Sequence, residues 1–195
     1  DEKTAVNNLK EEGYETLFAE VFKGEAEPLT YDNVAKAIGA FERTLITVDR
    51  FDKFLAGDDT AMTETELKGY QTFVQSGCAS CHNGALFGGS MYMKMGLINA
   101  YENTHDLGRF AVTNNPADKY VFKVPSLRNI TKTAPYFHDG AVAGLDEAVA
   151  QMAWMQLGRR LSDQEVSEIV AFLGALEDTH TITVKYLNNG AEVGQ

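Results

Sequence analysis

Hydrophobic residues recur at helical spacing near the N-terminal end of the chain and predict two helices there. The first covers about Val6 to Phe22, and the Gly24–Pro28 stretch ends it. A second helix is expected after Thr30, where apolar residues again return every three or four positions. The two apolar stripes are Leu9, Gly13, Leu17 and Val21, and Val34, Ala37, Ile38, Phe41 and Leu45. We interpret both as sides of helices that face a core.

Further helices are predicted by two capping boxes, in which a hydroxyl residue is followed three positions later by glutamate. Thr63 and Glu66 begin a helix that runs toward Gly77. Ser162 and Glu165 begin a final helix with a long apolar stripe. Its members are Val166, Ile169, Val170, Leu173 and Leu176. One more helix is expected from Leu145 to Gln156.

Between His82 and about Leu145 the helical period fails, and glycines, Asn114-Asn115-Pro116 and Pro125 predict long loops. These loops are rich in aromatic side chains, so we do not expect disorder. The aromatic members are Phe87, Tyr92, Phe110, Tyr120, Phe122, Tyr136 and Phe137. Loops this long in a compact domain are usually functional. We expect an all-α fold whose loops wrap a large flat cofactor.

Composition and charge narrow the class of protein. The chain has 195 residues, of which 44% are hydrophobic and 23% charged, as in an ordinary globular protein. Its apolar stretches fall short of the roughly 20 residues that span a bilayer, and Asp1 opens on a polar segment rather than a signal peptide. The net charge of −11 argues against nucleic acid as a partner. It suits a basic redox partner, although acidity that only maintains solubility explains it equally well.

The strongest chemical signal is Cys78-Ala79-Ser80-Cys81-His82, which matches the attachment motif of a c-type haem. The two thiols bond the porphyrin, and the imidazole that follows becomes the proximal iron ligand. Other readings are a thioredoxin-like pair, half of a zinc site or a disulfide. A zinc site would need four ligands and a thioredoxin motif would need a preceding strand, so both fit this sequence less well than the haem motif does. One motif predicts one covalent haem c, attached outside the cytoplasm.

The sixth iron ligand separates an electron carrier from an enzyme with an open iron. A methionine thioether would raise the haem potential. Met152, on the predicted helix Leu145–Gln156, is the first candidate, and Met155 is the second. A third option is the loop cluster Met91, Met93 and Met95.

Several long motifs resemble the bacterial di-haem cytochrome c peroxidases, and they occur in the order found in that family. The match covers about Tyr14 to Leu176. The motifs lie at 37–45, 50–58, 77–82, 122–129 and 134–140. The resemblance implies a cytochrome c-like helical domain, corresponding to the C-terminal, electron-accepting half of such an enzyme.

Family members reduce hydrogen peroxide to water in the periplasm with electrons from a small cytochrome c or a copper protein. By this resemblance Cys78 and Cys81 anchor the haem, and His82 and Met152 are its axial ligands. Related methylamine-utilisation enzymes have a tyrosine in place of that methionine, so Met152 favours the peroxidase branch. The peroxide-binding haem belongs to an N-terminal domain, so no catalytic residue is expected in this chain.

Calcium is a further implication of the resemblance, with the backbone carbonyls of Thr133 and Pro135 as ligands shared with the other half. Carbonyl oxygens suit this hard cation, although an ordinary turn explains these residues as well. Arg128 and Arg109 are candidates to pair with haem propionates, because a guanidinium fits a carboxylate. His138 is expected to be structural.

We therefore divide the chain into a helical lead-in at 1–60, a cytochrome c-like haem domain at 61–178 and a tail at 179–195. Thr181–Val184 in the tail is a candidate edge strand. The lead-in would join a second haem domain outside this sequence, which makes the chain a fragment of a peroxidase. The alternative is a free-standing mono-haem electron carrier, and a weaker third idea is an open iron that reacts with peroxide. Trp154 is expected in the core, and a homodimer remains an open arrangement.

Overall fold

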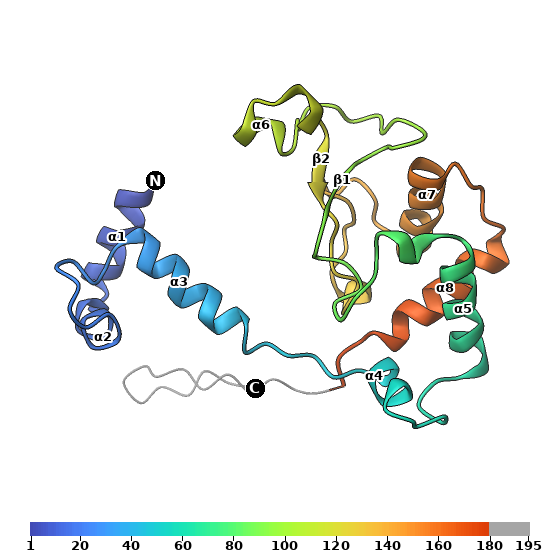
Figure 1. The fold of residues 1–195 in the computed structure, drawn as a ribbon, viewed down its shortest axis with the longest axis horizontal. Helices are drawn as coiled ribbons and strands as arrows, with labels where there is room; N and C mark the ends of the chain where they lie inside the picture. The colour runs from blue at the N-terminus through green and yellow to red at the C-terminus, as the bar shows by residue number, and fades with distance from the viewer. Residues whose placement is uncertain (180–195) are drawn as a thin grey trace. The chain divides into compact units, whose positions relative to one another are not determined.

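The computed structural model describes residues 1–179, which belong to two compact units. The first unit is Asp1–Ile46 and the second is Thr47–Gln195 (Figure 1). The strand expected at Thr181–Val184 lies outside the described residues. We describe each unit by itself.

The first unit holds three helices. They are α1 (Glu2–Glu11), α2 (Glu15–Val21) and α3 (Tyr31–Glu42). The single helix predicted across Gly13 is wrong, because Gly13 has a φ of +83° and interrupts the helical backbone between α1 and α2. The helix predicted after Thr30 is confirmed, and the Thr30 hydroxyl caps it by accepting from the Asn33 backbone N–H at 3.2 Å.

The second unit is mostly helical, which confirms the all-α prediction. Its α-helices are α4 (Arg50–Leu55), α5 (Glu64–Gln75), α6 (Phe110–Thr113), α7 (Leu145–Leu157) and α8 (Asp163–Ala175). Short 3₁₀ helices are η1 (Cys78–Ser80), η2 (Pro116–Asp118) and η3 (Ile130–Lys132). Within the long loops, β1 (Tyr92–Lys94) and β2 (Val121–Lys123) form an antiparallel pair with Met93 opposite Phe122. The loops thus carry a small sheet that the sequence analysis did not predict.

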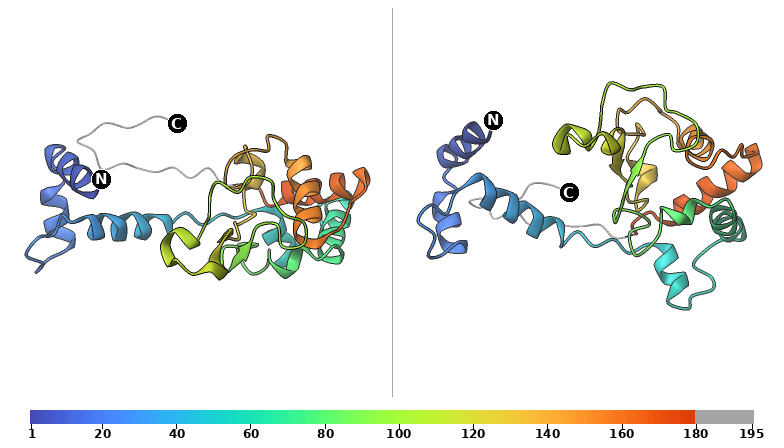
Figure 2. Two further views of the ribbon diagram at one scale, coloured as in Figure 1. Left: turned by 90° about the horizontal axis from the view of Figure 1, so that it is seen from above. Right: turned by 45° about the horizontal axis from the view of Figure 1, so that its top comes forward.

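Helices α5 and α8 lie side by side, and both contribute residues to the main hydrophobic core of the unit (Figures 1 and 2). Both predicted capping boxes are present at their N-termini. The helices approach so closely that a Cβ on Gly69 would lie 1.9 Å from the Glu168 carbonyl oxygen. Across the same contact the Thr72 hydroxyl donates to the Glu168 carboxylate at 2.7 Å. Glycine at position 69 therefore sets how α5 crosses α8.

An aromatic cluster fills the space beside this helix pair. Phe172 of α8 is fully buried, and its ring lies 5.2 to 5.8 Å from four other aromatic rings. These rings belong to Phe51, Tyr70, Phe73 and Phe87. Phe51 comes from α4, a helix that was not predicted, and Phe87 comes from the loop after the Cys78–His82 motif. The cluster therefore fixes that loop to the helices.

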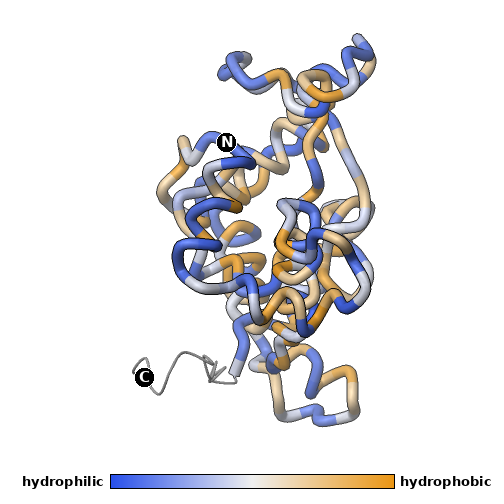
Figure 3. The backbone as a smooth tube through the Cα atoms, turned by 90° about the vertical axis from the view of Figure 1, so that its left-hand side faces the viewer, coloured by the Kyte–Doolittle hydropathy of each residue, from blue (hydrophilic) through white to orange (hydrophobic). Residues whose placement is uncertain are grey.

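None of the helices in residues 1–179 is long and apolar enough to cross a membrane. Hydrophobic and hydrophilic positions alternate at short intervals along the backbone (Figure 3).

Candidate haem-binding site

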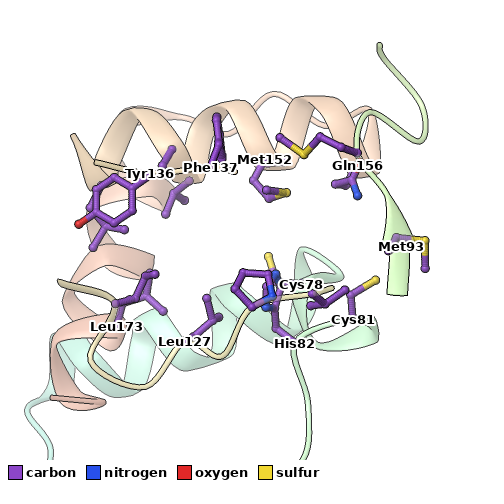
Figure 4. A pocket seen from close by; sticks show the side chains of 18 of the residues that line it. Cys78, Cys81, His82, Met93, Leu127, Tyr136, Phe137, Met152, Gln156 and Leu173 are labelled. Carbon is purple, nitrogen blue, oxygen red and sulfur yellow. The ribbon is translucent and has the colours of Figure 1, made fainter. Parts of the chain in front are cut away.

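The second unit contains a cavity of about 410 Å³ that is lined mostly by apolar side chains. This volume lies within the range of pockets that bind small molecules and cofactors, roughly 300 to 1,000 Å³. Helix α7 forms one wall, and the segment Cys78–His82 lies opposite it (Figure 4). Strands β1 and β2 and the stretch 124–138 supply further lining residues.

The two cysteines reach the cavity because α5 ends just before them. Gly77 has a φ of +95° and ends the direction of α5. The short 3₁₀ helix η1 follows, with Cys78 as its first residue and Cys81 directly after it. Both are free thiols and both line the cavity. Burial raises the pKa of the Cys78 thiol to about 11, so this cysteine is protonated at neutral pH. The fold therefore presents both thiols to the cavity from one short turn.

His82 lines the same cavity, and its backbone N–H donates to the Cys78 carbonyl at 3.0 Å. Burial lowers the pKa of its imidazole, while the carbonyl groups of Phe87 and Pro125 act in the opposite direction. The ring is therefore neutral at neutral pH, the state in which histidine binds a metal. Its Nδ1 atom is buried and makes no hydrogen bond of standard geometry within the described residues.

Gly88 allows the backbone to pass directly behind this ring. It has a φ of +127°, and a Cβ added there would lie 2.1 Å from the Pro125 carbonyl oxygen and 3.3 Å from His82 Nδ1. Metal-binding histidines usually direct their second nitrogen to such a carbonyl, which makes the ligand more basic. The surroundings of His82 thus suit a ligand whose other nitrogen, Nε2, binds iron.

Among the methionines, Met152 points from α7 into the cavity, toward His82 on the opposite wall (Figure 4). Met155 is only 5% exposed and does not line the cavity, so it belongs to the core. Met93 and Met95 line the cavity from β1 and the residue after it. The structure therefore brings the first candidate, and not the second, to the cavity.

Neither arginine considered for the propionates lines the cavity. Arg128 forms ion pairs with Asp49 and Asp52. Arg109 pairs with Asp118 at 3.5 Å and lies over the Tyr92 ring, 4.8 Å from its centroid. Carboxylates of the protein therefore engage the guanidinium of Arg128, whereas within the described residues Arg109 makes a single longer ion pair through Nε, and pairing with propionates stays a prediction for both.

Thr133 and Pro135 both line the cavity. No group of three or more His, Cys, Asp or Glu side chains that could hold a metal ion occurs among the described residues.

His138 also lines the cavity, with its ring stacked on Phe122 at 4.1 Å between centroids. The core prediction for Trp154 is wrong, because 37% of this residue is exposed and Arg160 lies over its ring.

Sequence reasoning missed Gln156, which holds the chain next to β1. Its Oε1 accepts from the backbone N–H groups of Gly96 and Leu97, each at 2.8 Å, and its Nε2 donates to the Lys94 carbonyl at 2.9 Å. Nothing in the sequence pattern marks this residue, because its partners are backbone groups about sixty positions away.

These residues fit a c-type haem. The cavity is apolar, the two thiols lie together, and an imidazole with a buried, unpaired Nδ1 lies opposite a thioether. The fold and the site together define a c-type cytochrome domain.

Comparison with known proteins gives the same class and a narrower family. Residues 67–177 match the cytochrome c family model, and residues 1–60 match the model described as di-haem cytochrome c peroxidase. The chain belongs to the di-haem cytochrome c peroxidase family.

Two curated relatives are cytochrome c551 peroxidases. The protein of Nitrosomonas europaea is 49% identical over 165 residues, and that of Pseudomonas aeruginosa is 45% identical over 168 residues. Each alignment covers 84% of this chain and 49% of the relative, so the chain spans about half the length of these relatives. The crystal structure of a MauG-like protein associated with microbial copper homeostasis superposes with a TM-score of 0.70 at 26% identity, covering 91% of this chain and 62% of that one.

Proposed function

We propose that this chain supplies the high-potential, electron-transferring c-type haem of a cytochrome c peroxidase. The whole enzyme reduces hydrogen peroxide to water with electrons from a small cytochrome c or a copper protein. The observation that carries the proposal is the pairing of His82 and Met152 across one apolar cavity that also receives both thiols. The names of the relatives support the peroxide-reducing activity of the whole protein.

In this proposal each site residue has a defined role. Cys78 and Cys81 would hold one haem c covalently, and His82 and Met152 would bind its iron. When bound, the haem supplies a one-electron iron couple. The Met152 thioether raises its potential, and the apolar walls exclude water, which also favours the less charged reduced iron.

The peroxide-reducing centre of the enzyme lies outside the sequence described here. We assign no catalytic residue to this chain and propose a second, peroxidatic haem domain as its partner. The carbonyls of Thr133 and Pro135 would contribute to a calcium site shared with that domain. Their oxygens are of the kind that calcium binds, but other ligands are needed to complete six to eight. We place the enzyme in the periplasm and leave a homodimer open.

A second candidate function is a mono-haem electron carrier without a catalytic site. The one Cys-x-x-Cys-His motif in this sequence would suffice for such a carrier. A third candidate is an open iron that reacts with peroxide, which would require that Met152 not bind.

Absorption spectra of the haem-loaded chain, before and after stoichiometric peroxide, test the proposal. We expect a low-spin ferric spectrum with a methionine-to-iron charge-transfer band, unchanged by peroxide. A high-spin spectrum that peroxide converts to an oxidised form would refute Met152 as ligand and favour the open iron.

The covalent attachment and the parent protein need separate experiments. Replacing Cys78 and Cys81 by alanine should remove haem that survives denaturation, with loss measured by haem staining of a denaturing gel. The intact mass and haem count of the natively produced protein distinguish the two main functions. A parent with two haems and about twice the mass supports the peroxidase, whereas a mono-haem chain of this length supports the carrier.

A further inference from the structure

We propose that Arg128 is a positioning residue for the proximal histidine: its guanidinium ties the loop 83–89 behind His82 to the start of α4. The inference rests on the proposed function, in which His82 is a haem ligand. It concerns the setting of the haem potential rather than a contact with the haem.

Arg128 joins two parts of the unit that are distant in the sequence. Its Nε and Nη2 donate to the Ala85 carbonyl at 3.0 and 2.8 Å. On the other side, Nη1 and Nη2 donate to the Asp52 carboxylate at 2.9 and 2.8 Å, and Nη1 also donates to Asp49. The guanidinium carbon lies 5.6 Å from the centroid of the Phe87 ring. All three nitrogens of the guanidinium group therefore donate hydrogen bonds.

This junction is well shielded from solvent. The Arg128 side chain is 11% exposed and that of Asp49 is fully buried. Burial alone would lower the pKa of Arg128, but Asp52 and Asp49 raise it, so the guanidinium stays charged. A charged fork between two carboxylates and a carbonyl has little freedom to move.

The loop that Arg128 holds is the one that backs the imidazole. Ala85 lies three residues after His82, and the Phe87 N–H closes a turn on the Gly84 carbonyl at 3.0 Å. Gly88, in the same loop, lies so close to the imidazole that a Cβ added there would be 3.3 Å from Nδ1. A shift at Ala85 therefore moves the backbone directly behind the ligand.

The shape of arginine matters for this role, because lysine offers a point charge rather than a planar fork. Arg128→Lys keeps the positive charge at this position and removes the simultaneous contacts with Ala85 and Asp52. A less firmly held loop supports the Nδ1 side of the imidazole less well, which makes the ligand less basic and favours reduced iron.

The matched control is Arg50→Lys. Arg50 is the first residue of α4, and its guanidinium makes a two-pronged pair with Glu66. Its guanidinium also donates to the Gly174 carbonyl at 3.4 Å, and among the described residues none of its hydrogen bonds or ion pairs reaches the loop 83–89. The same substitution is thus made in a similar ion pair away from His82.

The experiment is a potentiometric titration of the haem-loaded wild type and both variants at constant pH and salt. For Arg128→Lys we expect the equilibrium to move about tenfold toward the reduced haem, equivalent to about 59 mV for one electron. Arg50→Lys should stay within about twofold of the wild type. Equal midpoint potentials in all three proteins would overturn the inference and leave Arg128 a purely structural residue.

Two further outcomes have defined meanings. If the Arg128→Lys variant does not retain haem, Asp52→Glu is the second variant. It displaces the guanidinium of Arg128 and leaves all charges unchanged. A potential equal to that of the wild type in Asp52→Glu would overturn the inference. A wild type that attaches haem without the expected histidine and methionine ligation contradicts the proposed function instead. The wild-type spectrum therefore separates failure of the proposed function from failure of the role of Arg128.

Discussion

Gly88→Ala is the sharpest test of the backbone that supports His82. An alanine Cβ would lie 2.1 Å from the Pro125 carbonyl oxygen and 2.9 Å from its carbonyl carbon. Real Cβ atoms do not approach closer than about 3 Å, so the carbonyl must move by about 1 Å. The φ of +127° is also one that L-residues rarely adopt.

Both effects can be given a size. A backbone strained in this way costs on the order of 1–3 kcal/mol, and forcing an extra methyl into a packed site costs about 1–3 kcal/mol. We therefore expect the free energy of unfolding to fall by about 2–6 kcal/mol. Because the Pro125 carbonyl lies behind His82 Nδ1, its displacement by about 1 Å should also change how this carbonyl can support the imidazole, and a change of about 1 kcal/mol in the ferric state corresponds to about 40 mV in the potential.

Denaturant unfolding and potentiometric titration of the haem-loaded protein measure the two effects. Gly84→Ala is the control, because Gly84 also has a positive φ of +72° but an added Cβ would meet nothing within 4 Å. It should lose about 1–2 kcal/mol from backbone strain and leave the potential unchanged. The reasoning is refuted if the two variants show the same stability and the same potential.

Three other changes have distinct expected results. Met152→Ala should abolish the low-spin spectrum, whereas Met155→Ala should keep the spectrum and lower the unfolding free energy by about 2–5 kcal/mol, as for a core residue; the reverse pattern would exchange their roles. Phe172→Ala should cost about 3–5 kcal/mol in denaturant unfolding, because it leaves a cavity among four aromatic rings, and a cost below about 1 kcal/mol would contradict that packing. Burial, together with the hydrogen bond and charge of Asp139, raises the pKa of Tyr101 to about 12, so Asp139→Asn should lower it in an ultraviolet titration. Because this pKa lies above the unfolded value of about 10, the contribution of Tyr101 to the free energy of unfolding is complete below pH 10 and disappears as the pH rises through 12. A Tyr101 pKa that Asp139→Asn leaves unchanged would exclude Asp139 as a cause.

Local signals in the sequence predicted most of the helices. The capping boxes at Thr63 and Ser162 mark α5 and α8 correctly, because such boxes act within four residues. Helix α4 has the same device with Asp49 and Asp52, but the acidic form was not recognised. Gly13 was read as part of an apolar stripe, and its left-handed backbone instead separates two helices.

The site was partly predictable for the same reason. Cys78, Cys81 and His82 form a contiguous motif, and the family resemblance pointed to Met152. Their ligand roles remain proposals, although the structure gathers all four at one cavity. Gly88 and Gln156 could not be found in this way, because their importance depends on backbone groups brought close by folding.

The contact between α5 and α8 has a consequence for how the chain folds. Thr72 and Glu168, which meet across it, are 96 positions apart in the sequence. Folding must close a loop of that size before the central contact forms, so we expect slower folding than in helical proteins with local contacts. Until then the Cys78–His82 segment stays accessible on an open chain, and haem attachment at that stage would precede the formation of the walls that later enclose it.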